Sequence, residues 1–326
     1  MVEAEQPNSR ENEVEKRGTR IAERGTSARG RLGRRVGPLG EGGGMFRVLS
    51  RPDTEHRTLN TESSANPRLT MRIATFNANS IRSRLEIVLA WLKANKPDVL
   101  AIQETKVEDK DFPALAFEGA GYKVVFRGQK SYNGVAIVSR APATDLVFGL
   151  DDEPRDETRL VAAKVGPVHV VNTYVPQGRE IDNPMYPYKL EWFRRLKAFF
   201  SRHYTPRQKV VWVGDLNVAP EAMDIHNAAE QEEHVCYHVD VRKAFADTVS
   251  WGFTDVFRKH HPEPGSYTFF DYRTINAVKR NMGWRVDHIL ATKPLAAKST
   301  DAFIDLEPRM ADKPSDHTFL VADFDV

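Results

Sequence analysis

The chain has 326 residues with a formal charge of only +2, and its single cysteine, Cys236, excludes an internal disulfide. Hydrophobic residues make up 40% and charged residues 28%, which is ordinary for a folded protein, and no apolar run reaches the roughly 18 residues of a membrane span. The polar, acidic start is unlike a secretory signal, so we expect a cytoplasmic protein that makes no contact with a membrane.

Residues 1–70 differ in composition from the rest of the chain. They hold nine of the 20 glycines, include an Arg/Gly stretch from Arg29 to Arg35, and contain Phe46 as their one aromatic residue. So little apolar surface predicts a disordered extension. We favour a dispensable extension over a nucleic-acid-binding arm or a targeting peptide, because acidic residues reduce its charge to +3. Residues 71–326, with a charge of −1, are predicted to form the functional domain.

From Met71 onward, predicted strands and helices are mixed along the chain. Apolar runs, alternating or continuous, predict strands over residues 71–77, 99–102, 122–126, 135–139, 168–174, 210–213, 286–291 and 319–324. Apolar residues at helical spacing predict helices over residues 81–95 and 188–203. This mixture, without a visible internal repeat, predicts an α/β fold in which two sheets pack together with helices outside.

Polar side chains stand at the ends of several predicted strands. They are Asn77, Asn79, Gln103, Glu104, Asp215, Asn217, Asp287, Asp316 and His317. Each one alone has an ordinary explanation as a turn former, a helix cap or a structural histidine. Five strands with such ends, however, are what a site at one edge of packed sheets requires.

The motifs around these residues resemble those of the exonuclease–endonuclease–phosphatase superfamily, most closely its exodeoxyribonuclease III branch. Each motif is weak alone, but eight of them in the family's order argue against chance. Ser80, Phe269-Phe270 and His288 depart from the family's common residues in the DNA-facing pocket, and the catalytic positions are all filled. The matching stretches are residues 75–79 with Arg82, then 103–106, 134–139, 172–178, 214–217, 267–273, 283–290 and 315–317.

The resemblance implies a four-layer α/β sandwich, with two packed mixed β-sheets flanked by helices, and a divalent cation, Mg²⁺ or Mn²⁺, held by oxygen ligands. The implied metal site comprises Asn77, Glu104, Asp215, Asn217, Asp316 and His317. The implied catalytic residues are Tyr174, Asp215, Asn217, Asp287 and His317.

Each implied catalytic residue has a physical role. Asp215 would orient or deprotonate the attacking water, and Asn217 would hold that water. Asp287 would orient His317, which acts either as a base or as a cation beside the phosphate. Tyr174 would donate a hydrogen bond to the phosphate or to the leaving oxygen.

The resemblance also implies that Lys106, Phe269, Trp284 and Arg285 contact DNA. In the resembled family, residues matching Phe269 and Trp284 line a pocket for an extruded abasic sugar, which is easily flipped out because it lacks a base. The alternatives are that the basic residues are solvated surface charge and that Phe269 and Phe270 belong to the core.

The implied function is that of a monomeric DNA phosphodiesterase of base-excision repair. It would cut duplex DNA 5′ to abasic sites and remove nucleotides or blocking groups from 3′ ends. Two alternatives stay open: another phosphodiesterase of the superfamily, acting on sphingomyelin, inositol phosphates or RNA, and a catalytically inactive DNA-binding regulator. The lack of a secretory signal disfavours a secreted sphingomyelinase, and the competent residue at each catalytic position disfavours the regulator.

Overall fold

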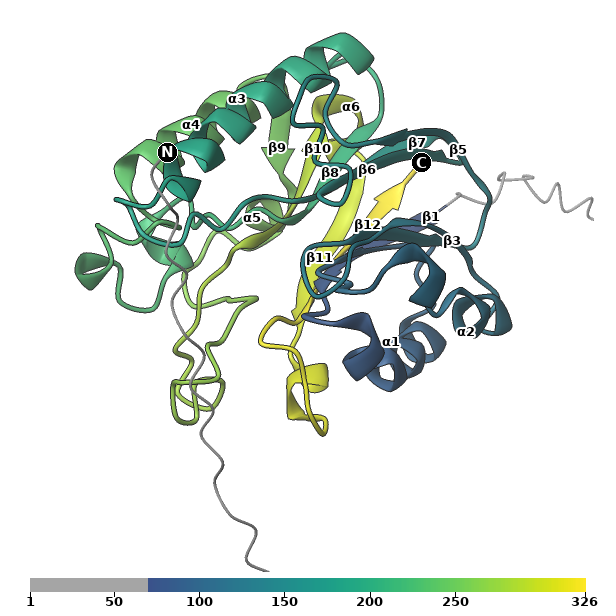
Figure 1. Ribbon diagram of the computed structural model, residues 1–326, viewed down its shortest axis with the longest axis horizontal. Coiled ribbons are helices and arrows are strands. Elements are labelled where there is room, and N and C mark those ends of the chain that lie inside the picture. The colour runs from purple at the N-terminus through teal and green to yellow at the C-terminus, as the bar shows by residue number, and fades with distance from the viewer. Residues whose placement is uncertain (1–69) are drawn as a thin grey trace, which may run out of the picture. The chain divides into compact units, whose positions relative to one another are not determined.

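The computed structural model describes residues 70–326, which form two six-stranded β-sheets packed against each other between layers of helices (Figure 1). The first sheet has the strand order β11-β12-β1-β2-β4-β3, and the second has the order β5-β6-β7-β8-β10-β9. The predicted disordered extension lies outside the described residues, apart from Thr70. The predicted architecture, an α/β sandwich of two mixed sheets, is confirmed.

The first sheet is built from β1 (Thr70–Asn77), β2 (Val99–Gln103), β3 (Lys123–Arg127), β4 (Val135–Ser139), β11 (Ser299–Asp305) and β12 (Phe319–Asp325). The second is built from β5 (Ala143–Phe148), β6 (Leu160–Val165), β7 (Val168–Tyr174), β8 (Val210–Asp215), β9 (Phe253–Asp255) and β10 (Asp287–Thr292). The α-helices are α1 (Ile81–Asn95), α2 (Ala114–Gly119), α3 (Met185–His203), α4 (Val239–Val249), α5 (Val256–His260) and α6 (Lys293–Ala296).

The two sheets follow the same plan, although no repeat is visible in the sequence. In each sheet the two central strands are parallel, β1 with β2 in the first sheet and β7 with β8 in the second. All other strand pairs are antiparallel. A parallel pair needs a crossover, and here α1 and α3 provide it. Each sheet therefore presents the carboxyl ends of two adjacent parallel strands, where open α/β sheets commonly bind ligands.

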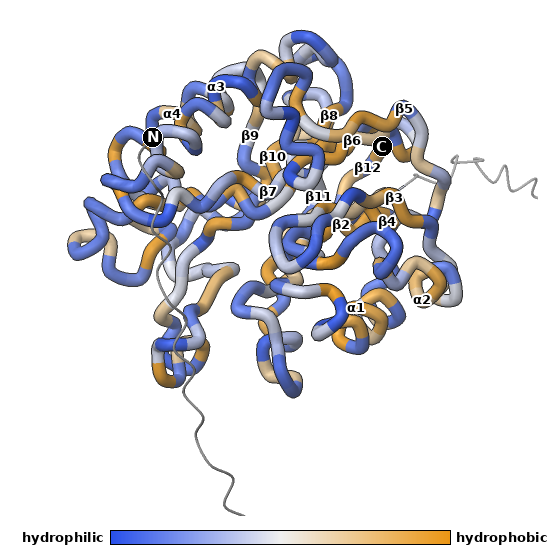
Figure 2. The backbone as a smooth tube through the Cα atoms, viewed as in Figure 1, coloured by the Kyte–Doolittle hydropathy of each residue, from blue (hydrophilic) through white to orange (hydrophobic). Residues whose placement is uncertain are grey.

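Three apolar cores hold the four layers together, and their side chains alternate along the strands. Ile73 of β1 lies in the core between the sheets, whereas its neighbour Ala74 packs in the core under α1 with Leu92. On the opposite side, α3 covers the second sheet and packs Phe193 in a third core. In Figure 2 the hydrophobic segments gather in the strands between the helical layers. Burial on both faces explains why the central strands read as nearly continuous apolar runs.

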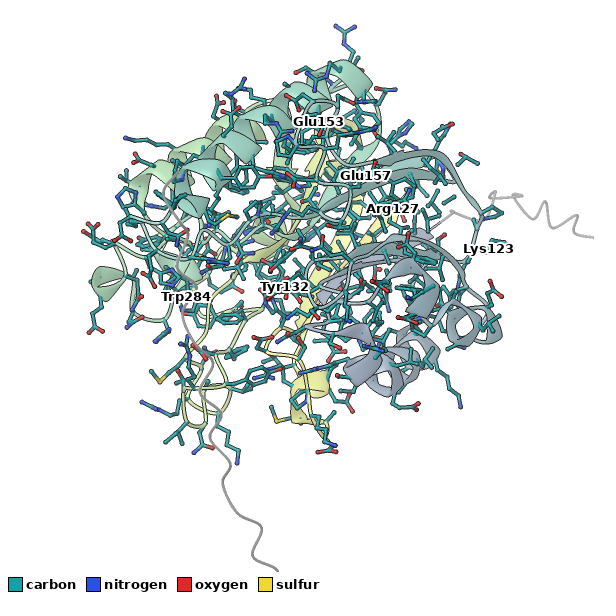
Figure 3. All side chains as sticks on the ribbon, viewed as in Figure 1. Lys123, Arg127, Tyr132, Glu153, Glu157 and Trp284 are labelled. Atoms are coloured by element: carbon teal, nitrogen blue, oxygen red, sulfur yellow. The ribbon has the colours of Figure 1, made fainter. Side chains whose placement is uncertain are left out.

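Polar contacts of Asn172 cross the apolar core between the sheets. Gln103 at the end of β2 donates from Nε2 to Asn172 Oδ1 of β7 at 2.7 Å. Asn172 in turn donates to the backbone carbonyls of Ile102 and Ala136, at 3.0 and 2.8 Å. At an outer edge, Arg127 Nε lies 3.6 Å from Glu157 Oε2, and the two side chains are neighbours in Figure 3. Polar contacts inside a core specify one arrangement, so the bonds of Gln103 and Asn172 set how the two sheets face each other.

The strands that the sequence analysis did not predict are β5, β6, β9 and β11. Three of them are outer strands of their sheets, and β9 has only three residues. Much of β5 and of β11 is exposed or half-buried, so neither carries a strong apolar pattern. Among residues 70–326, no helix is both long and apolar enough to cross a membrane.

Candidate active site

The carboxyl ends of the two parallel strand pairs bring the predicted site residues together. Asn77 and Gln103 are register partners at the ends of β1 and β2. In the other sheet, Tyr174 and Asp215 are register partners at the ends of β7 and β8, and Asp287 at the start of antiparallel β10 pairs with Asp215. Three adjacent strands therefore place a phenol and two carboxyl groups in one row.

Glu104 enters the site from a turn with unusual backbone geometry. Its φ is 49°, and that of Lys106 is 53°, in the left-handed region that side chains of this kind rarely adopt. Backbone bonds from Thr105 N to Gly134 O and from Lys106 N to Asn133 O hold the turn. Gly134 is required there, because a Cβ at that position would lie 2.0 Å from Thr105 Oγ1. Such strain persists only where the surroundings enforce it, and it is typical of functional sites.

Asn77 connects the acidic groups of the two sheets. Its amide nitrogen donates to Glu104 Oε1 at 2.7 Å and to Asp215 Oδ2 at 2.8 Å. Its amide oxygen accepts from the backbone nitrogen of Asn79 at 2.9 Å. The side chain of Asn79 continues the chain, donating to Asp316 Oδ1 at 3.0 Å. Three carboxyl groups from different parts of the sequence are thus held by two asparagines.

His317 lies between two carboxyl groups. Its Nδ1 is 2.8 Å from Asp287 Oδ2, and its Nε2 is 3.8 Å from Asp215 Oδ2. Burial alone would lower the pKa of His317, but Asp287 and Asp215 outweigh it and raise the pKa to about 10. Burial raises the pKa of Asp215 to about 7, against the effect of His317 and together with repulsion from Asp287 and Glu104. The two carboxyl groups therefore favour the protonated form of His317, and burial favours proton uptake by Asp215.

Tyr174 presents a neutral phenol to the same space. Burial, together with the nearby carboxyl groups of Glu104 and Asp215, raises the pKa of Tyr174 well above its ordinary value. Arg159 donates to the Tyr174 carbonyl oxygen at 3.2 Å, and its guanidinium lies 5.0 Å from the centre of the ring. The tyrosine is therefore a fixed hydrogen-bond donor.

The donor set of this site fits a hard divalent cation. Glu104, Asp215 and Asp316 line the cleft with carboxylate oxygens, and the amides of Asn77 and Asn79 hold these carboxyl groups at 2.7–3.0 Å. Oxygen-rich sites suit Mg²⁺ and Mn²⁺ rather than zinc.

A cleft of about 530 Å³ opens above these groups. Phe269 lies on its wall, with its ring centre 5.0 Å from that of His317, whereas the adjacent Phe270 is fully buried in the core. Trp284 is half-buried in the same wall and is labelled at the left of Figure 3. Besides Phe269 and Trp284, the predicted site residues that line the cleft are Glu104, Tyr174, Asp215, Asn217, Asp316 and His317.

Lys106, predicted to contact DNA, lies at the same edge. Its Nζ is 2.8 Å from Glu104 Oε2 and 2.5 Å from Asn79 Oδ1. The ammonium thus neutralises part of the acidic charge beside the cleft while the side chain stays partly exposed, at 28%. This placement is compatible with a phosphate contact.

The prediction that Arg285 contacts DNA is wrong. Its side chain is only 1% exposed, and its guanidinium donates to Asp224 and Asp255 at 2.7 Å each and to His288 Nδ1 at 3.0 Å. Arg258 pairs with Asp224 as well. A guanidinium that is buried and bonded to carboxylates of the protein cannot reach a phosphate. Arg285 has a structural role instead, because it links the segment before β10 to Asp224 and Asp255.

We expect Arg285→Ala to lower the free energy of unfolding by about 3–5 kcal/mol, because it leaves the buried Asp224 and the half-buried Asp255 without a main partner. Burial alone would raise the pKa values of Asp224 and Asp255, but Arg285 together with Arg258 at Asp224 and with His288 at Asp255 outweighs it and lowers both pKa values. Their contribution to stability is therefore present above about pH 4 and is lost as the pH falls. Denaturant titrations at pH 7 and at lower pH measure both effects.

The same variant tests the corrected role. Each DNA phosphate contacted contributes about 0.9 to the slope of log K against log salt concentration. For the folded Arg285→Ala protein we expect an unchanged slope, as for the exposed-arginine control Arg155→Ala. A slope reduced by about one with full stability would instead place Arg285 on the DNA.

Two residues that matter for the site were not predicted from the sequence. Asn79 was noted only as a strand-end residue, yet it joins Asp316 to Lys106. Lys189 is fully buried below the cleft. A signal for Lys189 was present, because it stands four and seven residues before Phe193 and Leu196, on the apolar face of the predicted helix.

Comparisons with known proteins agree with this geometry. The family model described as endonuclease/exonuclease/phosphatase family matches residues 74–317. Exodeoxyribonuclease III of Haemophilus influenzae is 30% identical over 267 residues, which is 78% of this chain and 100% of that protein. An AP endonuclease from Archaeoglobus fulgidus is 53% identical, with a TM-score of 0.78 over 78% of this chain and 100% of its own. A 3′ phosphatase from Neisseria, solved with a product DNA hairpin, is 40% identical, with a TM-score of 0.73 over the same shares. The chain therefore belongs to the endonuclease/exonuclease/phosphatase family, in the branch that contains exodeoxyribonuclease III and the AP endonucleases.

Proposed function

We propose that this protein is a divalent-metal-dependent DNA phosphodiesterase of base-excision repair. It hydrolyses the phosphodiester bond 5′ to abasic sites and removes nucleotides or blocking groups from the 3′ ends of duplex DNA. The observation that carries the proposal is the convergence of Glu104, Tyr174, Asp215 and His317 from two sheets on one cleft. The relatives named as exodeoxyribonuclease III and AP endonuclease support the substrate class.

The cation that we propose is Mg²⁺ or Mn²⁺. Glu104 and Asp316 would hold it, with Asp215, Asn217 and Asn77 close by. When bound, it polarises a phosphoryl oxygen and neutralises charge that develops on the leaving oxygen.

Side chains from both sheets carry the proton chemistry: Tyr174 and Asp215 end β7 and β8 of the second sheet, and His317 precedes β12 of the first. Asp215, with its pKa raised to about 7, takes the proton of a water molecule that attacks phosphorus. His317 keeps a proton on Nδ1 toward Asp287, and its Nε2 side faces the phosphate as part of an imidazolium. Tyr174 donates to the 3′ oxygen as its bond to phosphorus breaks. Of the two roles left open by the sequence, the cation is thus favoured for His317.

The wall of the cleft supports the choice of an abasic lesion. Phe269 borders His317, and Trp284, which is paired with Phe269 through backbone hydrogen bonds, lies on the same wall. Apolar rings beside the reacting phosphate favour a deoxyribose that has left the helix, and extrusion costs least where the base is missing. Lys106 would contact a neighbouring phosphate.

The test is incision of a duplex that carries one tetrahydrofuran abasic analogue, with Mg²⁺, with Mn²⁺ and with EDTA. We expect one nick 5′ to the analogue, leaving a 3′ hydroxyl, only when a metal is present. An undamaged duplex of the same sequence is the control, and a duplex with a 3′ phosphate reports removal of blocking groups. Binding without incision in any metal would favour the inactive regulator. Hydrolysis of sphingomyelin, an inositol phosphate or RNA in preference to DNA would favour another phosphodiesterase.

A further inference from the structure

A lysine is buried beneath the cleft. Lys189 of α3 has no exposed surface, and burial lowers the pKa of its ammonium group. In the described part of the chain, its hydrogen-bond partners are three backbone carbonyl oxygens and the sulfur of Cys236, all neutral groups. Burying an ammonium without a paired carboxylate is costly, so this lysine requires an explanation beyond packing.

The three carbonyl groups belong to three separate loops. Lys189 Nζ donates to Gln177 O at 3.0 Å, to Asn217 O at 2.6 Å and to Val235 O at 2.8 Å. Gln177 follows β7, Asn217 follows β8, and Val235 precedes α4. An ammonium has three N–H donors, and here each has one carbonyl partner. One side chain therefore joins the loops that follow the two parallel strands of the second sheet.

The carbonyl of Asn217 is the contact with consequences for the reaction. Asn217 has a φ of 50°, its backbone nitrogen donates to Asp215 Oδ1 at 2.9 Å, and its side-chain nitrogen donates to Val175 O at 3.0 Å. The carbonyl bond to Lys189 fixes the remaining polar group of its backbone. A left-handed turn persists only when its surroundings over-determine it, and this turn sets both Asp215 and Asn217 in the cleft.

We propose that Lys189 is a positioning residue for phosphodiester hydrolysis: it acts through the Asn217 carbonyl to hold the Asp215–Asn217 turn in its productive orientation. The inference rests on the proposed function, because a productive orientation has meaning only for an active enzyme. Lys189 does not itself touch the reacting atoms. Groups that support a site from behind typically change rates by about 10–100-fold when removed.

The experiment compares Lys189→Met with Lys259→Met in the full chain. Lys259 is a matched control, because its Nζ also donates to two backbone carbonyls, Ala296 O at 2.8 Å and Ser299 O at 3.2 Å, but away from the cleft. We expect Lys189→Met to lower kcat for the abasic duplex by about 10–100-fold with KM changed little, and Lys259→Met to leave both unchanged. Equal kcat in the two variants, per folded molecule, would overturn the proposal.

A second measurement tests whether Lys189 acts through Asn217. If it acts through this turn, adding Lys189→Met to the double variant Asp215→Ala/Asn217→Ala, in which the turn has no functional side chain left to orient, should cost little further activity, because coupled groups are non-additive. Independent, multiplying losses would overturn the assignment. An inactive wild-type protein would instead remove the proposed function on which the inference rests.

Chemical rescue covers the case in which Lys189→Met does not fold. In a Cys236→Ala background, Lys189→Cys is alkylated in the unfolded state with 2-bromoethylamine, which restores an ammonium on a side chain of similar length, and is then refolded. We expect kcat to recover to within a few-fold of the Cys236→Ala parent. Two outcomes would contradict the positioning role. In the first, the alkylated protein folds but its kcat stays about 10–100-fold below that of the parent. In the second, the unalkylated Lys189→Cys protein already has the parent's kcat.

Discussion

Replacing His317 with asparagine is expected to slow incision at an abasic site by about 10³–10⁴-fold, and Asp287→Asn should cost nearly as much. His317 Nδ1 lies 2.8 Å from Asp287 Oδ2, and Asp287 raises the pKa of the imidazole against the effect of burial. Asparagine at 287 would remove the charge that keeps His317 a cation beside the phosphate. Because the two side chains work as one unit, the double variant should be little slower than the slower single variant.

Single-turnover kinetics on the abasic duplex, at saturating metal, measure these losses. His169→Asn is the control, because His169 is a half-buried histidine near the start of β7, whereas Tyr174 and the cleft are at its other end. It should retain full activity. Circular dichroism and thermal melting establish that each variant is folded. Losses that multiply in the double variant would show that His317 contacts the phosphate without help from Asp287. Retained activity per folded molecule would make the pair purely structural.

The second large effect is expected for Glu104→Gln, with a loss of about 10²–10³-fold in turnover, equivalent to several kcal/mol of transition-state stabilisation. The amide keeps the shape of the side chain but removes the charge that a divalent cation requires. The substitution also removes the ion pair with Lys106, because in the wild-type protein the Lys106 ammonium lies 2.8 Å from Glu104 Oε2. Binding of Mn²⁺, followed by its paramagnetic resonance, should weaken in parallel with turnover.

A matched control lies four residues further along the chain. Glu108 forms an ion pair with Lys110 at 2.9 Å, the same two-residue spacing as Glu104 and Lys106, but both side chains are more exposed there. Exposed ion pairs contribute little, so Glu108→Gln should leave turnover and metal affinity unchanged. Near-normal turnover and Mn²⁺ binding in Glu104→Gln would remove Glu104 from the metal site.

The sequence was most informative where burial is repetitive. The residues of β4 and β7 were predicted with the bounds that the structure has, and α1 was predicted as residues 81–95, because central strands and amphipathic helices carry strong apolar patterns. The outer strands β5 and β11 were not predicted, because strands with exposed faces lack that pattern.

By itself, the sequence determined the element types of the central strands and long helices, the polar residues at their ends, and the family that these motifs resemble. Only the tertiary structure decided which ends meet, since the pairing of β1 with β2 and of β7 with β8 brings Asn77 within hydrogen-bonding distance of both Glu104 and Asp215. It also decided that Arg285 is buried among acidic partners and that Lys189 joins three loops. The physical reason is that periodicity reports local burial, whereas the environment of a charged group depends on partners distant in sequence.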